Sequence, residues 1–390
     1  MKIGYLHIGA LQHGIRRYGR LLAAEAQSRS QLQVIEAEVN LTGDRQHDCT
    51  SLIHAAQTLA QADVVHFQYN RAIWRDHWSQ LSYLDAFLNH CSRPLVVTLH
   101  DIFYPPSSAT LTQRYFSHPG TVRFSDLAKA VLRDRVAPHI LALQKVIARS
   151  RVVIVCTQEE AQRLSDRIDR AKLSIIPHFV ESRHLQNDRA EARRTLGLEP
   201  FTVITLLGFI YSGKGHSLLI RALPKLPETV KVIFAGGVSA GHEAYYQELL
   251  SLAEQVGVRD RLRVTGYLPE AELEQYLLST DLAVCPFRQT SASGSLSTWI
   301  SVERPILASN IPQVEEYNRL QPHAIATFEP YTSDAIVDAL NHLIPSCSPE
   351  PDPNVSRLRH HLSMPKIFDQ HLSHYQAAYE SQSYSSAKIA

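Results

Sequence analysis

Residues 282–309, LAVCPFRQTSASGSLSTWISVERPILAS, contain one complete strand–helix–strand unit and predict the fold of the chain. The stretch opens with an apolar run at 282–286 and closes with a second one at 306–309. Between them, Leu296 and Trp299 lie at helical spacing after a segment of small hydroxylic residues. Two short apolar runs joined by a helix are typical of a parallel sheet that is buried on both faces.

The same alternation runs through the whole chain and predicts the α/β class. Strands are expected at residues 3–8, 33–37, 64–68, 95–99, 152–156 and 173–176 in the first half, and at 202–207, 231–235, 261–265, 282–286 and 306–309 in the second. A chain of 390 residues with 44% apolar residues suits two domains.

The domain boundary is expected in a polar, arginine-rich stretch at residues 181–194, which has no strand signal. This divides the chain into an N-terminal domain, 1–182, and a C-terminal domain, 183–365. A Pro- and Ser-rich stretch at 345–353 precedes an isolated helix predicted at 367–379.

Composition and charge exclude several classes of protein. The net charge of +1 gives no indication of a nucleic-acid binder. No uninterrupted apolar stretch approaches the roughly 18 residues of a membrane span, and the N-terminus begins directly with a strand. The five cysteines contain no C-x-x-C pair and are expected to be reduced thiols of a cytoplasmic protein. The absence of D-x-D and H-E-x-x-H patterns indicates no metal site, and no cofactor is expected.

The segment Ser291–Ala292–Ser293–Gly294–Ser295–Leu296 begins the helix of the opening stretch. Backbone amides at such a helix start can face an anion, and phosphate is the natural ligand. The alternative is an ordinary serine N-cap, which needs no ligand.

A second candidate is Lys214, which lies between Gly213 and Gly215 after the predicted strand 202–207. A lysine at a strand-to-helix turn can bring its ammonium to a phosphate while the backbone comes close. The G-x-x-x-x-G-K-[ST] order of a P-loop is absent. The alternative is a solvated loop lysine.

Two turns of the first half are further candidates. The glycine-containing loop before the helix that starts near Gly14 lacks the G-x-G-x-x-G pattern of dinucleotide-binding folds. The strand 95–99 runs directly into His100 and Asp101. Polar groups at the carboxyl end of a strand lie over the ligand crevice of such sheets, which favours a functional role over a capping Asp beside a surface His.

Taken together and in order, these motifs resemble the family 4 retaining glycosyltransferases of the GT-B fold, over nearly the whole chain. The matching pieces are HGIRRY at 13–18, TLHD at 98–101, IPHFV at 176–180, Gly208 with Lys214 and Gly215, VTGY at 264–267, and PILAS at 305–309.

The resemblance implies two Rossmann-like domains with a cleft between them, and a C-terminal helix, 366–380, that packs back on the first domain. It also implies a metal-independent hexosyltransferase that moves a sugar, with retention of configuration, from a GDP- or UDP-sugar to a glycan or lipid-linked acceptor in polysaccharide or envelope assembly. His100 and Lys214 are the expected catalytic residues. The expected donor-binding residues are Gly14, Lys214, Gly266, Tyr267, Ser293, Gly294, Ser295, Leu296 and Thr298.

The chain departs from the family pattern at three positions. Phe209 replaces an arginine that follows the glycine of the phosphate loop. Thr290 and Thr298 stand where the family has two glutamates, which contact the donor sugar and the ribose. A threonine cannot form the bidentate clamp of a carboxylate on a diol. Lys214 and the helix start are therefore expected to hold the phosphate largely alone.

The acceptor is expected on the first domain, at residues 69–78 and 104–136. Tyr69, Trp74 and Trp78 are candidate contacts, and the two tryptophans suit either a sugar-stacking pair or core packing. Residues 124–150 mix apolar and basic side chains, which allows peripheral contact with an anionic inner membrane face or a simple solvated helix face.

Three other functions suit the same fold. The missing glutamates favour a non-catalytic nucleotide-sugar-binding or partner subunit. A nucleotide-sugar epimerase and a phosphorylase are the alternatives among enzymes.

Overall fold

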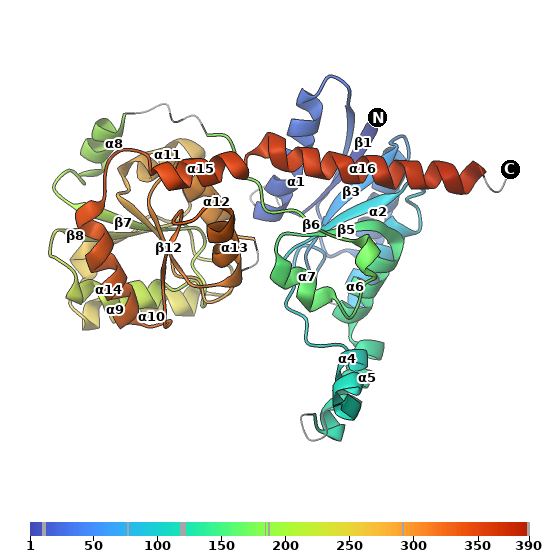
Figure 1. The fold of residues 1–390 in the computed structure, drawn as a ribbon, viewed down its shortest axis with the longest axis horizontal. Helices are drawn as coiled ribbons and strands as arrows, with labels where there is room; N and C mark the ends of the chain where they lie inside the picture. The colour runs from blue at the N-terminus through green and yellow to red at the C-terminus, as the bar shows by residue number, and fades with distance from the viewer. Residues whose placement is uncertain are drawn as a thin grey trace. The chain divides into compact units, whose positions relative to one another are not determined.

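The structure is a computed structural model that describes residues 1–9, 13–75, 78–117, 122–183, 185, 188–290 and 292–387. The chain divides into two compact units (Figure 1). The first contains Met1–Pro177 together with Pro365–Ala390, and the second contains His178–Met364. The first unit therefore ends five residues before the boundary placed from sequence.

The first unit is built on a six-stranded sheet with the order β2-β1-β3-β4-β5-β6. Its strands are β1 (Lys2–Ile8), β2 (Gln33–Val39), β3 (Val64–Tyr69), β4 (Leu95–Leu99), β5 (Ser150–Val155) and β6 (Leu173–Ile175). All its strand pairs are parallel. Successive strands are therefore joined by crossovers, which place helices on the faces of the sheet.

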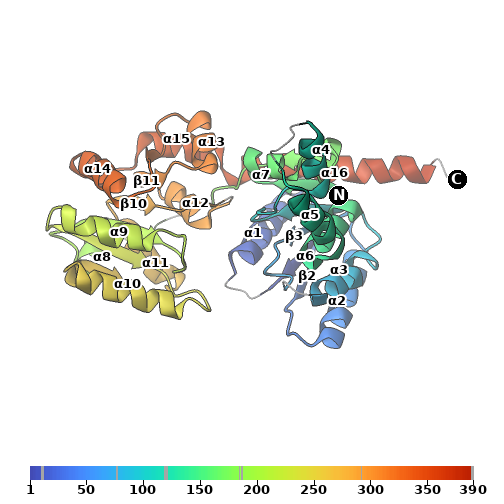
Figure 2. The same ribbon diagram turned by 90° about the horizontal axis from the view of Figure 1, so that it is seen from below.

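The two faces of this sheet are covered differently. On one face, α2 (Arg45–Leu59), α3 (Trp78–Leu88) and α6 (Pro138–Arg149) bury an apolar core against β1 and β3–β5. Figure 2 shows α2 and α3 side by side. On the other face, α1 (Gly14–Ser28) and the C-terminal helix α16 (Met364–Ala387) cover a layer of buried aromatic and polar side chains. The remaining helices of the unit are α4 (Ser108–Ser117), α5 (Phe124–Val136) and α7 (Gln158–Leu164).

The second unit repeats the architecture with the strand order β12-β11-β10-β7-β8-β9. Its strands are β7 (Thr202–Leu207), β8 (Val230–Ala235), β9 (Leu262–Val264), β10 (Leu282–Cys285), β11 (Ile306–Ser309) and β12 (Ala326–Phe328). All its pairs are parallel too. The short strand β12 was not predicted, because three residues without an apolar run give too little pattern to distinguish a strand from a loop.

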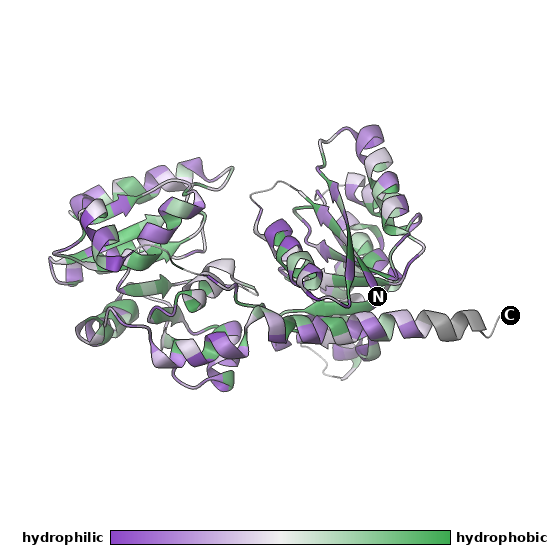
Figure 3. Cartoon of the chain, turned by 90° about the horizontal axis from the view of Figure 1, so that it is seen from above, coloured by the Kyte–Doolittle hydropathy of each residue, from purple (hydrophilic) through white to green (hydrophobic). Residues whose placement is uncertain are grey.

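Helices cover both faces of the second sheet, whose strands are largely hydrophobic (Figure 3). On one face lie α9 (His216–Ala222), α10 (Glu243–Gln255) and α14 (Ser333–Leu343), as Figure 1 shows. On the other lie α8 (Arg189–Leu196), α11 (Glu270–Ser279), α12 (Gly294–Ser301), α13 (Pro312–Leu320) and α15 (Pro353–His361). Burial of the strands on both faces explains why they are short, nearly continuous apolar runs.

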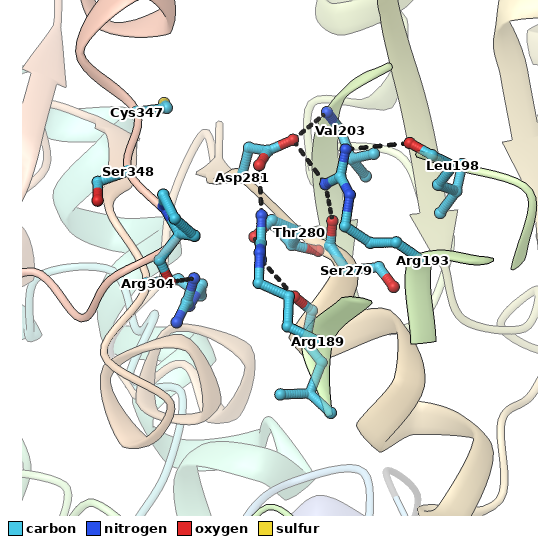
Figure 4. A network of polar contacts seen from close by, with 12 residues as sticks. Arg189, Arg193, Leu198, Val203, Ser279, Thr280, Asp281, Arg304, Cys347 and Ser348 are labelled. Carbon is cyan, nitrogen blue, oxygen red and sulfur yellow. Dashed lines mark hydrogen bonds and ion pairs between the residues drawn. The ribbon is translucent and has the colours of Figure 1, made fainter. Parts of the chain in front are cut away.

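The stretch expected to be a linker contains a docked helix. Asp188 caps α8, and the helix ends at Gly197 in the left-handed conformation. Arg193 donates to Asp281 at 3.0 Å, Arg189 also pairs with Asp281, and that carboxylate accepts the amide of Val203 at 2.7 Å (Figure 4). The arginines that suggested a solvated linker therefore attach α8 to the second unit.

Three further findings concern the cysteines, membrane spans and metal clusters. All five cysteines are free thiols. Within the described residues, no helix combines the length and the hydropathy needed to cross a bilayer. In the same residues, no three His, Cys, Asp or Glu side chains gather closely enough to hold a metal ion.

Candidate functional site

Lys214 occupies an unusual position for a lysine, because only 7% of it is exposed. Its ammonium lies 5.3 Å from the ring centre of Phe287 and 5.8 Å from that of Tyr211, and it donates to Ser295 Oγ at 3.4 Å. Within the described part of the chain, no carboxylate forms an ion pair with it. Burial lowers the pKa of Lys214 to about 8, so the group is still mostly charged at pH 7. A buried cation without a counter-charge is costly, which favours a site for an anion.

The start of α12 supplies backbone donors beside this lysine. Ser293 is the N-cap, in an extended conformation, and its Oγ accepts the amide of Leu296 at 3.2 Å. The Leu296 side chain lies in the core, and its amide is already hydrogen-bonded to the cap. The amides of Gly294 and Ser295 precede it in the first turn and have no acceptor among the described residues. Ser291 lies outside the described residues.

These two features meet at the topological switch point of the second sheet. From β7 the chain proceeds to β8 and β9 on one side, whereas β10, β11 and β12 extend on the other. The loop that carries Lys214 follows β7, and the segment that leads to α12 follows its neighbour β10. Open parallel sheets bind ligands outside the carboxyl ends of their strands at such a point.

Three glycines make room for this arrangement. A Cβ at Gly208, which has a φ of +105°, would lie 2.4 Å from Lys214 Nζ. A Cβ at Gly215 would lie 2.1 Å from the carbonyl oxygen of Pro286, and one at Gly236 would lie 2.3 Å from that of Gly208. Gly236 was not singled out from sequence, although two glycines directly after the buried strand β8 are a signal of close backbone approach.

Gly266 and Tyr267 lie at the carboxyl end of β9, next to the turn after β8. Gly266 has a φ of +74°, and the Thr265 hydroxyl accepts the amide of Gly236 at 3.1 Å. A Cβ at Gly237 would lie 3.3 Å from the Tyr267 amide nitrogen. The Tyr267 side chain is 62% exposed, so it offers a ring face near the glycine turns.

The three departures from the family pattern leave no carboxylate at the start of α12. The Thr298 hydroxyl donates to Gly294 O at 2.9 Å, so its proton is used within its own helix. Phe209 is exposed and brings no charge. Glu303 lies beyond the last turn of α12, where it pairs with Arg359 at 2.9 Å, and it is not a substitute for the missing glutamates.

In the first unit, His100 and Asp101 follow β4 at the carboxyl edge of their sheet. His100 is buried, and its Nε2 lies 2.8 Å from Gln68 Oε1. The ring of Tyr18 meets its ring edge-on at 5.1 Å. Asp101 has a φ of +57° and accepts from Asn70 Nδ2 at 2.9 Å. Gln68 and Asn70 were not predicted, although polar side chains alternate at 66 and 68 of β3 and at 70, directly after the strand.

Gly14 begins α1 on the same edge. His13 is the N-cap, and its Nδ1 accepts the amide of Ile15 at 3.3 Å. Burial lowers the pKa of His13, and the charge of Asp101 acts in the opposite direction, so these two groups lie close enough to interact. A side chain at Gly14 would meet no atom of the described residues within 4 Å.

The expected acceptor contacts need correction. Trp74 is fully buried, donates from Nε1 to Gln68 O at 3.0 Å and packs against Phe67 and Phe87. Tyr69 is likewise part of the core. Neither ring has a face on which a sugar can stack, because neighbouring core residues cover both. Trp78 differs, since it is 55% exposed at the start of α3.

Known protein families match both units. Residues 16–184 match glycosyltransferase family 4, and residues 201–346 match the glycosyl transferases group 1. D-inositol 3-phosphate glycosyltransferase of Mycobacterium sp. (strain KMS) is 31% identical over 159 residues, which are 39% of this chain and 36% of that protein. The alignment thus spans just over a third of the length of this curated relative. The chain belongs to the family 4 glycosyltransferases.

Solved structures identify the fold as GT-B. Anabaena HepE in complex with UDP and glucose superposes with a TM-score of 0.71 at 17% identity, covering 96% of this chain and 99% of that one. Sucrose-phosphate synthase from Thermosynechococcus elongatus superposes with a TM-score of 0.70 at 13% identity, covering 98% and 100%. Both likenesses concern the fold alone, and with the two parallel sheets they define two Rossmann-like units.

Proposed function

We propose that this chain transfers a sugar from a nucleoside-diphosphate donor, with retention of configuration and without a metal ion, to a hydroxyl of a glycan or lipid-linked acceptor. The observation that carries the proposal is Lys214, a buried ammonium beside the amides of Gly294 and Ser295. Among the described residues, Lys214 has no carboxylate partner and these amides have no acceptor. A donor diphosphate supplies the missing negative charge. Anabaena HepE has been crystallised with UDP-glucose, which makes UDP-sugars the first donors to test.

The same groups account for catalysis. When the bond between the sugar and the diphosphate breaks, negative charge develops on the departing phosphate oxygens. A preorganised ammonium in a site of low dielectric stabilises this charge more than water does. With retention, the acceptor hydroxyl attacks from the face of the departing phosphate, which accepts the proton. No protein carboxylate then serves as nucleophile, in contrast with retaining glycosidases.

The donor proposal predicts measurable turnover in a panel of UDP-, GDP- and ADP-sugars. Even without an acceptor, the chain should slowly release nucleoside diphosphate from its donor. Addition of the matching nucleoside diphosphate should raise the melting temperature of the chain. If no sugar nucleotide is hydrolysed but one of them raises the melting temperature, the chain is a non-catalytic binding subunit. The lost carboxylates at Thr290 and Thr298 are the observation that favours this second candidate.

The hairpin of α4 and α5 extends away from the sheet of its own unit (Figure 1). Its surface supports a lipid-linked acceptor and peripheral membrane contact at the cytoplasmic face. It exposes large apolar side chains. These are Phe116, Phe124, Leu132 and Val136. Its exposed charged residues are mainly basic, namely Arg114, Arg123, Lys129 and Arg135, against Asp126. Apolar and basic groups together suit an anionic lipid surface, and a solvated face needs no large exposed rings.

Co-sedimentation with phosphatidylglycerol vesicles tests this contact. The chain should pellet with anionic vesicles at low salt and stay in solution with neutral ones, and Phe124→Ser with Leu132→Ser should release it. Equal recovery in the supernatant with both kinds of vesicle would refute the membrane contact and leave donor chemistry unaffected.

A further inference from the structure

A layer of polar side chains lies buried between the first sheet and the C-terminal helix α16. His66 and Gln68 alternate on β3, Thr98 lies opposite on β4, and His100 follows that strand. From the other side, α16 contributes Tyr375. Each of these five side chains is more than nine-tenths buried. Buried polar groups of this density are retained only when they are hydrogen-bonded to one another.

The hydrogen bonds form one continuous chain from α16 to His100. Tyr375 Oη lies 2.7 Å from His66 Nδ1. On the other edge of that ring, His66 Nε2 lies 2.9 Å from Thr98 Oγ1 and 3.3 Å from Gln68 Nε2. The opposite atom of the Gln68 carboxamide, Oε1, lies 2.8 Å from His100 Nε2.

The chemistry of an amide gives this chain a direction. The Gln68 nitrogen can only donate, so His66 Nε2, which faces it, carries a lone pair. Burial holds the pKa of His66 well below its usual value, so the ring is neutral and its single hydrogen is on Nδ1, where Tyr375 accepts it. The Gln68 oxygen can only accept, so the hydrogen of His100 is on Nε2. In a neutral His100 ring, Nδ1 then carries the lone pair.

We propose that Gln68 is a positioning residue, which fixes His100 as the Nε2–H tautomer and is itself held in orientation by His66 and by Tyr375 of α16. The inference rests on the proposed function for the role of His100 in the reaction, although the tautomer can be tested without it. The consequence is chemical: a group that contacts Nδ1 must donate a hydrogen. A sugar hydroxyl meets this requirement, and an ionised phosphate oxygen does not.

The proposal also gives the C-terminal helix a specific task. The helix belongs to the same compact unit as β3 and β4, although it is separated from them by the whole second unit in sequence. Tyr375 also accepts from Tyr5 Oη of β1 at 3.4 Å, so it is fixed from two strands. Loss of the Tyr375 hydroxyl should allow the His66 ring to flip. The Gln68 carboxamide would then no longer be held in one orientation.

Nitrogen NMR of the full chain with ¹⁵N-labelled histidine rings tests the tautomer directly, with the His100 signals assigned by loss in His100→Gln. The wild-type chain should show His100 protonated on Nε2. Gln68→Met, which keeps the length and removes both amide atoms, should give a mixture of tautomers, and so, more weakly, should Tyr375→Phe. Hydrogen on Nδ1 of wild-type His100, or an unchanged tautomer in Gln68→Met, would overturn the proposal.

Gln80→Met is a matched control, because Gln80 is also a fully buried glutamine of the first unit but donates to Arg71 O and not to a histidine. It should cost similar stability and leave His100 unchanged. In sugar-transfer assays, Gln68→Met should lower kcat about tenfold with little change in the donor KM, while Gln80→Met should change neither. Equal kcat losses in both variants would show a structural role only and overturn the positioning role.

Failure of the proposed function gives a different pattern. In that case neither the wild-type chain nor any variant would transfer sugar, whereas the NMR result for Gln68→Met would still show the tautomer change. The two inferences are therefore separable in one set of variants.

Discussion

The carboxyl edges of the two sheets bury polar groups in opposite ways. In the first unit, His100 is hydrogen-bonded to Gln68, and Gln68 is hydrogen-bonded in turn to His66. In the second, Lys214 is buried as a cation whose counter-charge no described residue supplies. A hydrogen-bond network within the protein fixes the orientation of its side chains, whereas an uncompensated buried charge favours the binding of an oppositely charged ligand. The comparison assigns orientation to the first unit and anion binding to the second.

The largest effect on activity should come from Lys214→Met. Removal of one electrostatic donor from such a site typically lowers turnover by about 10²–10³-fold. Stability should not fall, because the lowering of the pKa of Lys214 from 10.5 to about 8 corresponds to roughly 3 kcal/mol spent on burying the charge. Steady-state kinetics and thermal unfolding check both. Lys225→Met, at a surface lysine paired with Asp334, is the control and should change neither.

Gly208→Ala should have the next largest effect, because the new methyl group would displace the Lys214 ammonium. We expect turnover to fall about 10–100-fold, with a loss of unfolding free energy of about 1–3 kcal/mol from the left-handed backbone. Gly213→Ala is the matched control: its φ of +99° brings similar strain, but no atom of the described residues lies within 4 Å of its Cβ. Equal kinetic losses in the two variants would mean that backbone strain alone is responsible.

The buried histidines of the first unit should make the chain acid-labile. Burial lowers the pKa of His371 to about 3, below the usual 6.5, so the unfolded chain binds its proton first. The stabilising effect is fully present above pH 6.5 and is lost as the pH falls towards 3, by up to about 1.4 kcal/mol per pH unit. His371→Leu should reduce the difference in urea midpoint between pH 7.5 and pH 5. An unchanged difference would contradict a neutral buried ring.

The smallest effect should follow Trp78→Ala. Because Trp78 is half exposed, its loss should leave the melting temperature within a degree or two and raise the acceptor KM only a few-fold. Trp74→Ala provides the contrast: loss of a fully buried indole should cost about 3–5 kcal/mol of unfolding free energy. Similar unfolding curves for the two variants would contradict the separation of these tryptophans into surface and core.

Much of the fold could be predicted from sequence, because strands that are buried on both faces are apolar runs with clear ends. The run at 202–207 and that at 306–309 coincide with β7 and β11. Arg189 and Arg193 could not be interpreted in this way, because their partner Asp281 lies 92 and 88 positions further along the chain, outside any local sequence window. Their partner is visible only in three dimensions.

The residues of the candidate sites could be predicted only in part. Lys214 and Ser293 were singled out from sequence, and the structure brings Lys214 within hydrogen-bond distance of Ser295. Gln68 was missed because it lies inside a strand, where one polar residue looks like an interruption of the apolar pattern rather than part of a site. Trp74 was misplaced for the reverse reason, since spacing alone does not tell which face of an element is covered.

Calorimetric titration of UDP, GDP and ADP into the wild-type chain, Lys214→Met and Lys225→Met at pH 7 tests the central claim most directly. We predict that at least one nucleoside diphosphate binds the wild-type chain and Lys225→Met equally, and binds Lys214→Met at least tenfold more weakly. Equal affinity for Lys214→Met would contradict the assignment of the buried ammonium to the donor phosphate.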